Sequence, residues 1–170
     1  MTGTGFTTTF TVDQTRAEAF AAVLDPRGWW AEGIDGRTDE VGAEFTYAFE
    51  DVHRTRIRVT DIEPDRKVSW LVLENHFNFT QDDTEWTGTT MTFDITEADG
   101  ATTVRFTHEG LVPAYECFEA CSTGWTFYVA TSLRNLIATG TGQPNADGRP
   151  RLDTEVAAVE ATGRRAAAHA

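Results

Sequence analysis

Basic residues are scarce in this sequence. Its 170 residues include 14 Lys and Arg against 27 Asp and Glu, which gives a formal net charge of −13 at pH 7. Because duplex nucleic acid and anionic membrane surfaces are bound through clustered Lys and Arg, neither is expected as a partner. The acidic surface is expected to serve solubility.

Long apolar runs are missing as well. No run approaches the roughly 20 apolar residues that a membrane-spanning helix requires, so no membrane span is expected. The segment from Met1 to Phe6 lacks the basic and apolar regions of a signal peptide. These two absences predict a cytoplasmic protein.

Cysteine is limited to Cys117 and Cys121, which lie one turn apart on a predicted helix. Their Cβ atoms run side by side there, so a disulfide between them would need distortion. A redox or metal-binding pair is the alternative to two half-buried thiols, and we expect the thiols. The sequence also shows no spaced His/Cys metal set, phosphate loop or dinucleotide fingerprint, so neither a metal nor a cofactor is expected.

What is present is a series of alternating segments between two helical ones. A Thr-rich strand over 7–12 precedes a helix that Asp13 or Thr15 can cap. Five further alternating segments predict strands over 41–49, 55–61, 68–73, 86–96 and 103–108, with hairpin turns at 63–65 and 98–100. Pro113 then suits the first turn of a long helix that extends to Leu136.

This order of elements predicts an α+β fold. Strands grouped between helices favour a curved antiparallel sheet with the long helix packed across one face, and the cleft between them is a usual place for a small molecule. Beyond Gly140 the sequence becomes Gly/Pro-rich over 142–150 and Ala-rich over 152–170. We therefore expect one domain over 1–140 and a flexible tail over 141–170.

Several short motifs carry a family resemblance. They are Asp25-Pro26 with Trp29-Trp30, the segment 85–89, the junction 108–111, and the segment 121–125 followed by Ser132-Leu133. In this order they resemble the START-related helix-grip (SRPBCC) superfamily, and within it the heat-shock-protein-ATPase-activator-homologue branch, over about residues 6–140. The resemblance implies a helix-grip fold with a deep cavity for an apolar ligand, in a superfamily that includes lipid carriers, hormone receptors and polyketide cyclases.

The phase of the strands and of the long helix predicts which side chains line such a cavity. The sheet contributes Phe45, Tyr47, Trp70, Met91, Phe93, Phe106 and His108, and the helix contributes Phe118, Cys121, Trp125 and Tyr128. Trp29 and Trp30 could form the mouth, and Phe77 and Phe79 a strand extension or a flap. Any one ring taken alone is more simply a core residue. Together they predict binding of a small hydrophobic molecule, lipid-like or aromatic.

His108 is the candidate for chemistry, as a general acid or base, because it ends a strand in phase with Phe106. The alternative is a structural role in which it fixes the strand-to-helix turn. A nucleophilic Ser or Cys set cannot be assembled from the sequence. We therefore favour a binding protein. A polyketide cyclase or dehydratase is the enzymatic alternative, a co-chaperone-like interaction module is the third, and a monomer and a homodimer are both open.

Overall fold

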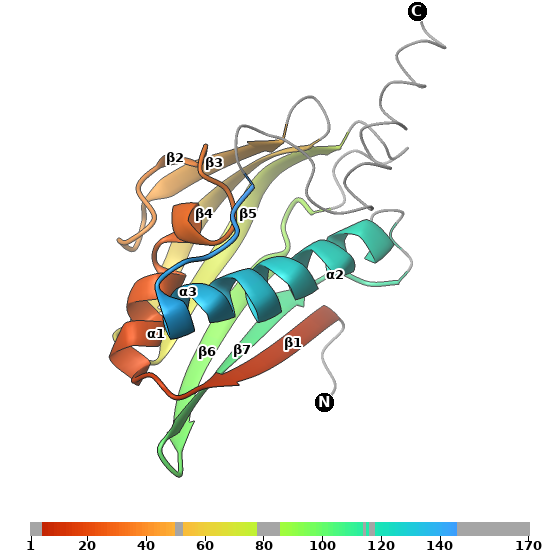
Figure 1. Ribbon diagram of the computed structural model, residues 1–170. Helices are drawn as coiled ribbons and strands as arrows, with labels where there is room; N and C mark the ends of the chain where they lie inside the picture. The colour runs from red at the N-terminus through yellow and green to blue at the C-terminus, as the bar shows by residue number, and fades with distance from the viewer. Residues whose placement is uncertain (1–4, 50–52, 78–85, 114, 116–117, 146–170) are drawn as a thin grey trace, which may run out of the picture.

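The computed structural model describes residues 5–49, 53–77, 86–113, 115 and 118–145. Within these residues, one antiparallel sheet has the strand order β1-β7-β6-β5-β4-β3-β2 (Figure 1). Its strands are β1 (Gly5–Val12), β2 (Asp35–Gly36), β3 (Glu44–Phe49), β4 (His53–Glu63), β5 (Lys67–Phe77), β6 (Thr90–Ala98) and β7 (Ala101–Glu109). The helical segments are α1 (Arg16–Val23), η1 (Pro26–Gly28), α2 (Phe118–Phe127), η2 (Tyr128–Leu133) and α3 (Arg134–Thr139).

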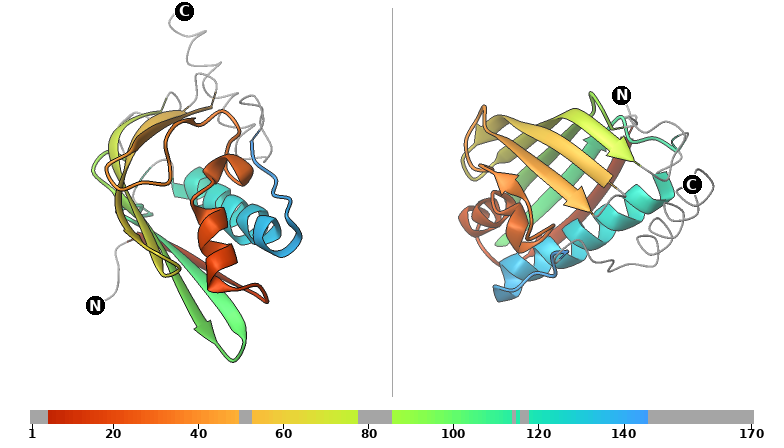
Figure 2. Two further views of the ribbon diagram at one scale, coloured as in Figure 1. Left: turned by 90° about the vertical axis from the view of Figure 1, so that its left-hand side faces the viewer. Right: turned by 90° about the horizontal axis from the view of Figure 1, so that it is seen from above.

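The predicted α+β helix-grip fold is confirmed. The sheet curves around the continuous helix formed by α2, η2 and α3, and α1 lies on the same concave side (Figure 2). None of the described helices is long and apolar enough to cross a membrane. Phe79 and most of the predicted tail lie outside the described residues.

The alternation of side chains sorts the two faces of the sheet. Along β4, Thr55, Ile57 and Val59 are buried while Arg56 and Arg58 are exposed, as a period of two requires. The hairpin between β6 and β7 turns at Asp99 and Gly100, whose φ values of 53° and 79° fit the type I′ turn that suits a twisted hairpin. The predicted inward phase of these strands is confirmed by burial.

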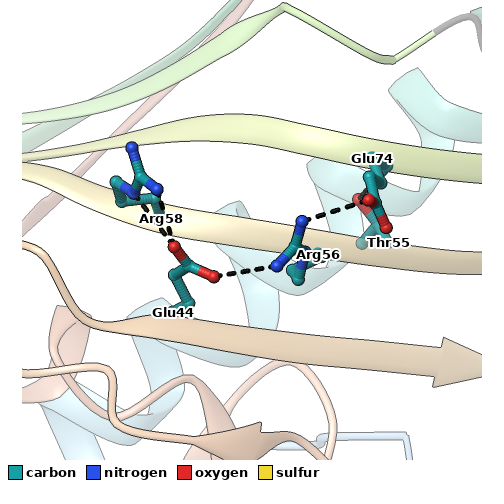
Figure 3. A network of polar contacts seen from close by, with 5 residues as sticks. All are labelled: Glu44, Thr55, Arg56, Arg58 and Glu74. Atoms are coloured by element: carbon teal, nitrogen blue, oxygen red, sulfur yellow. Dashed lines mark hydrogen bonds and ion pairs between the residues drawn. The ribbon is translucent and has the colours of Figure 1, made fainter.

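The outer face carries a network of charges across three strands (Figure 3). Glu44 on β3 accepts hydrogen bonds from Arg58 at 2.7 Å and from Arg56 at 3.1 Å, and Arg56 also pairs with Glu74 on β5 at 3.0 Å. The hydrogen bond from Arg58 lowers the pKa of Glu44. Because these groups face solvent, the network contributes little to stability and mainly favours the strand register.

The first helix begins at a capping box. The Thr15 hydroxyl accepts a hydrogen bond from the backbone N–H of Glu18 at 3.1 Å, and the Glu18 carboxylate accepts one from the backbone N–H of Thr15 at 3.3 Å. Of the two predicted caps, the structure therefore uses Thr15.

The long helix begins later than predicted. Pro113 lies in a turn, and α2 starts at Phe118. Gly110 at the end of β7 has φ of 94°, and a Cβ there would lie 2.6 Å from the Thr89 side chain. The chain therefore leaves the sheet through turns rather than directly into a helix. The prediction that Pro113 opens the helix is wrong for this reason.

The middle of the helix, η2, is a π-helix that the sequence pattern did not indicate. Its wider turns allow Trp125, Val129, Leu133 and Ile137, each four residues apart, to lie against the sheet. Leu136, the predicted end of the apolar face, is only half-buried, and Ile137 is buried instead.

Residues 141–145 return from the end of α3 and pack beside η1; we call them the strap. The Ser132 hydroxyl in η2 donates to the carbonyl of Trp29 at 2.7 Å and accepts from the backbone N–H of Gln143 at 2.6 Å. The backbone N–H of Asn145 donates to the carbonyl of Trp30 at 2.7 Å. The strap is thus bonded both to the helix and to the Trp29–Trp30 segment.

Gly142 is the tightest point of the strap, because a Cβ there would lie 2.3 Å from the carbonyl oxygen of Gly28. We expect Gly142→Ala to lower the free energy of unfolding by about 1–3 kcal/mol, the usual cost of overpacking. The matched control is Gly124→Ala in α2, where a Cβ would meet nothing within 4 Å. That variant should gain about 0.5–1 kcal/mol in urea unfolding, since Ala favours helices. Equal effects of the two changes would contradict the tight contact.

Candidate functional site

The predicted wall residues that the structure describes come from the concave side of the sheet, from the helix that faces it and, for Trp29 and Trp30, from the turn after η1. The structure buries Trp29, Trp30, Phe45, Tyr47, Trp70, Phe77, Met91, Phe93, Phe106, His108, Trp125 and Tyr128. Phe118 and Cys121 are partly buried and pack against this set. Trp86, which was not among the predicted wall residues, is buried with them.

These side chains contact one another as an inner aromatic cluster, defined here as Trp29, Trp30, Phe45, Tyr47, Trp70, Phe77, Trp86, Phe93, Phe106 and Trp125. Trp30 is central: its ring centroid lies 4.5 Å from Tyr47 and 4.9 Å from Trp125. Trp125 also lies 4.8 Å from Phe106. The rings of the helix therefore pack directly on the rings of the sheet.

Trp29 and Trp30 are inside the cluster rather than at a mouth. Trp29 is fully buried, stacks on Trp70 with centroids 6.3 Å apart, and donates its Nε1–H to the carbonyl of Ala22 at 3.0 Å. The turn at η1 directs both rings inward, a direction that the order of residues alone does not reveal.

Among the described residues, two indole groups in the cluster have no hydrogen-bond acceptor. Trp70 Nε1 and Trp86 Nε1 are buried donors for which the described residues provide no partner. A buried donor without an acceptor costs about 1–3 kcal/mol, so such groups are few in native proteins and call for an explanation. These two donors are the most unusual polar feature of the cluster.

His108 is the centre of a directional chain of hydrogen bonds. Because an indole can only donate, Trp125 Nε1–H donates to His108 Nδ1 at 3.1 Å, which places the ring proton on Nε2. That proton is donated to Thr89 Oγ1 at 2.8 Å, and the Thr89 hydroxyl donates to the carbonyl of Trp86 at 2.6 Å. The chain joins the helix to β7 and to the residues just before β6.

The same hydrogen bonds determine whether His108 can act as an acid or a base. The ring is fully buried, and this burial lowers the pKa of His108 to about 3, with a smaller contribution from the nearby His53. Both nitrogens are already hydrogen-bonded, so neither is available to a substrate in this arrangement. The geometry favours the structural role for His108 over the acid–base role.

A second buried histidine, His53, was not singled out from the sequence. It begins β4, and its Nε2 lies 2.7 Å from Oδ1 of Asn75 on β5. Burial lowers the pKa of His53 to about 3, although the hydrogen bond to Asn75 acts in the opposite direction. Its position was available from the sequence, because His53 is in phase with Thr55 and Ile57 on the inward face.

Trp86 was also missed, although it lies within a predicted strand. The structure places it in a turn before β6, because Gly88 has φ of 84°, a conformation that a strand does not use. The turn lets the Trp86 ring stack on Trp125 at 5.7 Å and contact His53 at 4.6 Å.

A separate hollow of about 540 Å³ lies on the surface between the end of α1 and β2. Its two arginines are already engaged: Arg27 donates to the carbonyls of Ile34 and Gly36, and Arg37 pairs with Asp39. Among the described residues, no group of three or more His, Cys, Asp or Glu side chains is placed to hold a metal ion. The inner cluster is therefore the better candidate site.

The two buried histidines predict a stability that falls with acid. Since the folded state holds both rings neutral and the unfolded chain takes up protons below its ordinary pKa of 6.5, stability is highest above 6.5 and falls toward pH 3. Each histidine contributes a slope of up to about 1.4 kcal/mol per pH unit. His108→Gln, which keeps one donor and one acceptor, should remove its share in urea unfolding between about pH 5 and 7. An unchanged slope would contradict the neutral assignment.

Comparison with known proteins identifies a family and several solved structures that this protein resembles. The model of the family described as Activator of Hsp90 ATPase homolog 1-like protein matches residues 13–138. No curated protein matches the sequence. Among solved structures, the Aha1 dimer from Colwellia psychrerythraea is similar with a TM-score of 0.66 and 20% identity, over 81% of this chain and 98% of that one.

Two other structures share the fold. DynU16, a putative protein in the dynemicin biosynthetic locus, is 19% identical with a TM-score of 0.58 over 83% of this chain, which spans only 49% of DynU16. CalU16 from Micromonospora echinospora is 15% identical with a TM-score of 0.57, over 96% of this chain and 86% of that one. At these identities the likeness shows the fold alone. The family match covers most of the chain, and the protein belongs to the family of Activator of Hsp90 ATPase homolog 1-like proteins.

Proposed function

We propose that this protein binds a small, largely apolar, ring-containing molecule between the concave face of the sheet and the α2–η2 helix. The observation that carries the proposal is the pair of buried indole donors, Trp70 Nε1 and Trp86 Nε1, for which the described residues offer no acceptor within an otherwise aromatic surrounding. A ligand that brings an acceptor oxygen to either donor would remove the cost of leaving it unpaired.

The aromatic surrounding suits a planar ligand. Ring pairs are favoured in offset-stacked and edge-to-face arrangements, and the inner aromatic cluster contains both, as in Trp30 on Tyr47 and Trp70 on Phe93. A planar guest between the helix and the sheet can replace such contacts with equivalent ones to itself. An extended alkyl chain offers no equivalent geometry.

The packing of the cluster sets a condition on binding. Because Trp125 contacts both Trp30 and Phe106, a ligand can enter between helix and sheet only if these ring contacts separate. The partly buried Phe118 and Cys121 lie on the same helix and are the predicted wall residues closest to solvent. Binding should therefore change the environment of Trp30 and Trp125 directly.

The relatives support the proposal at the level of fold. Of the similar structures, DynU16 is described as a putative protein in the dynemicin biosynthetic locus. A protein of this fold that is encoded in a biosynthetic locus is compatible with a role of the fold in binding a small molecule.

Neither alternative function has an observation in its favour. A cyclase or dehydratase that uses His108 would need a free ring nitrogen, and both are hydrogen-bonded. A co-chaperone-like role would need a docking surface, and among the described residues the only large exposed hydrophobic side chain is Val41. Ligand binding is the function that we carry forward.

A matched set of probes tests the proposal: 9-fluorenone, fluorene, which has the same rings without the carbonyl, and palmitate. We expect 9-fluorenone to bind about tenfold more tightly than fluorene, as one added hydrogen bond of about 1.4 kcal/mol would give, and both ring compounds more tightly than palmitate. Affinity is measured by calorimetry, and quenching of tryptophan fluorescence reports entry into the cluster.

Phe variants of the two donors provide the control. Trp70→Phe and Trp86→Phe each keep a ring and remove one N–H, so one of them should abolish the preference for 9-fluorenone over fluorene. The proposed function would be contradicted if none of the three probes bound. Equal affinities of fluorenone and fluorene for the unchanged protein would contradict the role of the indole donors.

A further inference from the structure

His53 differs from His108 in one respect that matters for a ligand. Both rings are buried and both are neutral, because burial lowers each pKa to about 3. His108 uses both of its nitrogens. His53 uses Nε2 alone, in the 2.7 Å hydrogen bond to Asn75, and among the described residues no donor is bonded to its Nδ1.

Asn75 determines which atom of His53 is left over. The contact is made by the amide oxygen of Asn75, which accepts, so Nε2 of His53 carries the proton and Nδ1 carries the lone pair. His53 and Asn75 are 8% and 7% exposed. The pair thus holds a neutral imidazole in one tautomer, with Nδ1 as its acceptor nitrogen.

The surroundings of His53 are those of the candidate site. Its ring centroid lies 4.3 Å from Phe77, 4.6 Å from Trp86 and 5.3 Å from Tyr47, all members of the inner aromatic cluster. Trp86 is perpendicular to His53, at 87°, and carries one of the two unpartnered indole donors. Two rings in direct contact therefore carry one acceptor and one donor that no described residue engages.

A hydroxyl group is the simplest ligand group that matches this pair. It can donate its proton to an imidazole nitrogen and accept a hydrogen bond from an indole N–H at the same oxygen. An ether or a ketone can accept but cannot donate. A carboxylate has no proton to give, and its charge would be costly among buried rings in a protein of net charge −13.

We infer that His53, oriented by Asn75, recognises a neutral hydroxyl group of the bound molecule, with Trp86 Nε1 as the paired donor. The inference rests on the proposed function and narrows it: the ligand class becomes planar, largely apolar molecules that bear a phenolic or alcoholic hydroxyl, rather than hydrocarbons, esters or fatty acids.

The experiment compares each positional isomer of hydroxy-9-fluorenone with the methyl-9-fluorenone substituted at the same carbon. Hydroxyl and methyl groups are similar in size, and the methyl compound is the more hydrophobic, so tighter binding of a hydroxyl isomer reports a hydrogen bond rather than shape. We expect at least one hydroxyl isomer to bind about tenfold more tightly than its methyl partner. His53→Phe, which keeps an aromatic ring, should reduce that ratio to about one, while His76→Phe, at an exposed position of β5, should leave it unchanged.

A measurement on the unaltered protein tests the role of His53 without relying on the correct folding of a variant. With 15N-labelled histidine, the Nδ1 resonance of His53 should move in the direction of a hydrogen-bonded nitrogen when the preferred hydroxyl isomer is added, and should not do so with its methyl partner. The resonances of His108 serve as the internal reference.

The outcomes separate the two proposals. If the fluorenones bind but no hydroxyl isomer is preferred over its methyl partner, the role of His53 is overturned while the proposed function stands. The same holds if the preference survives His53→Phe. If no fluorenone binds at all, both are overturned.

Discussion

The hydrogen bond from Trp125 to His108 fixes the relation between the helix and the sheet. It is directional and buried, and it continues through Thr89 to the backbone of Trp86. Apolar contacts alone would allow the helix to slide or rotate over a surface of similar rings, because burial is non-directional. A series of hydrogen bonds with one donor at each step allows a single arrangement of the helix on the sheet. The positions of the aromatic side chains on both layers follow from it.

This constraint also explains why an acidic protein keeps two uncharged histidines inside. Each ring has one hydrogen-bond donor and one acceptor only while it is neutral, and the chain through His108 uses that polarity at both nitrogens. At His53, only Nε2 has such a partner among the described residues. One histidine therefore completes the core, while the other has an acceptor nitrogen that no described residue engages.

Much of the architecture could be predicted from the sequence. Alternation in the strands gave the inward phase of Phe45, Trp70, Met91 and Phe106 correctly, because a period of two leaves little freedom once one face is buried. The family resemblance and the α+β order were also right. Trp29 and Trp30 were placed at a rim instead of inside, since their direction depends on a short turn whose geometry tertiary contacts decide.

The errors arose where tertiary contacts override local pattern. Pro113 looks like the start of a helix, but the close approach of Gly110 to Thr89 sends the chain through turns first. The π-helical turn depends on packing against the sheet, and no residue type encodes it. The site is harder still to predict. Whether a buried donor such as Trp70 Nε1 or Trp86 Nε1 has an acceptor among the described residues depends on the whole assembled fold.

The strap packs on the domain beyond Gly140, the residue at which the sequence predicts the domain to end. Ser132 lies in the middle of the helix, yet its hydroxyl is shared between the carbonyl of Trp29 and the backbone N–H of Gln143, and Asn145 bonds to Trp30. A shortened chain that stopped at Gly140 would leave those groups unpaired beneath the two tryptophans. The folding unit therefore includes a few residues that composition assigns to a linker, and these residues help to hold the segment that carries Trp29 and Trp30.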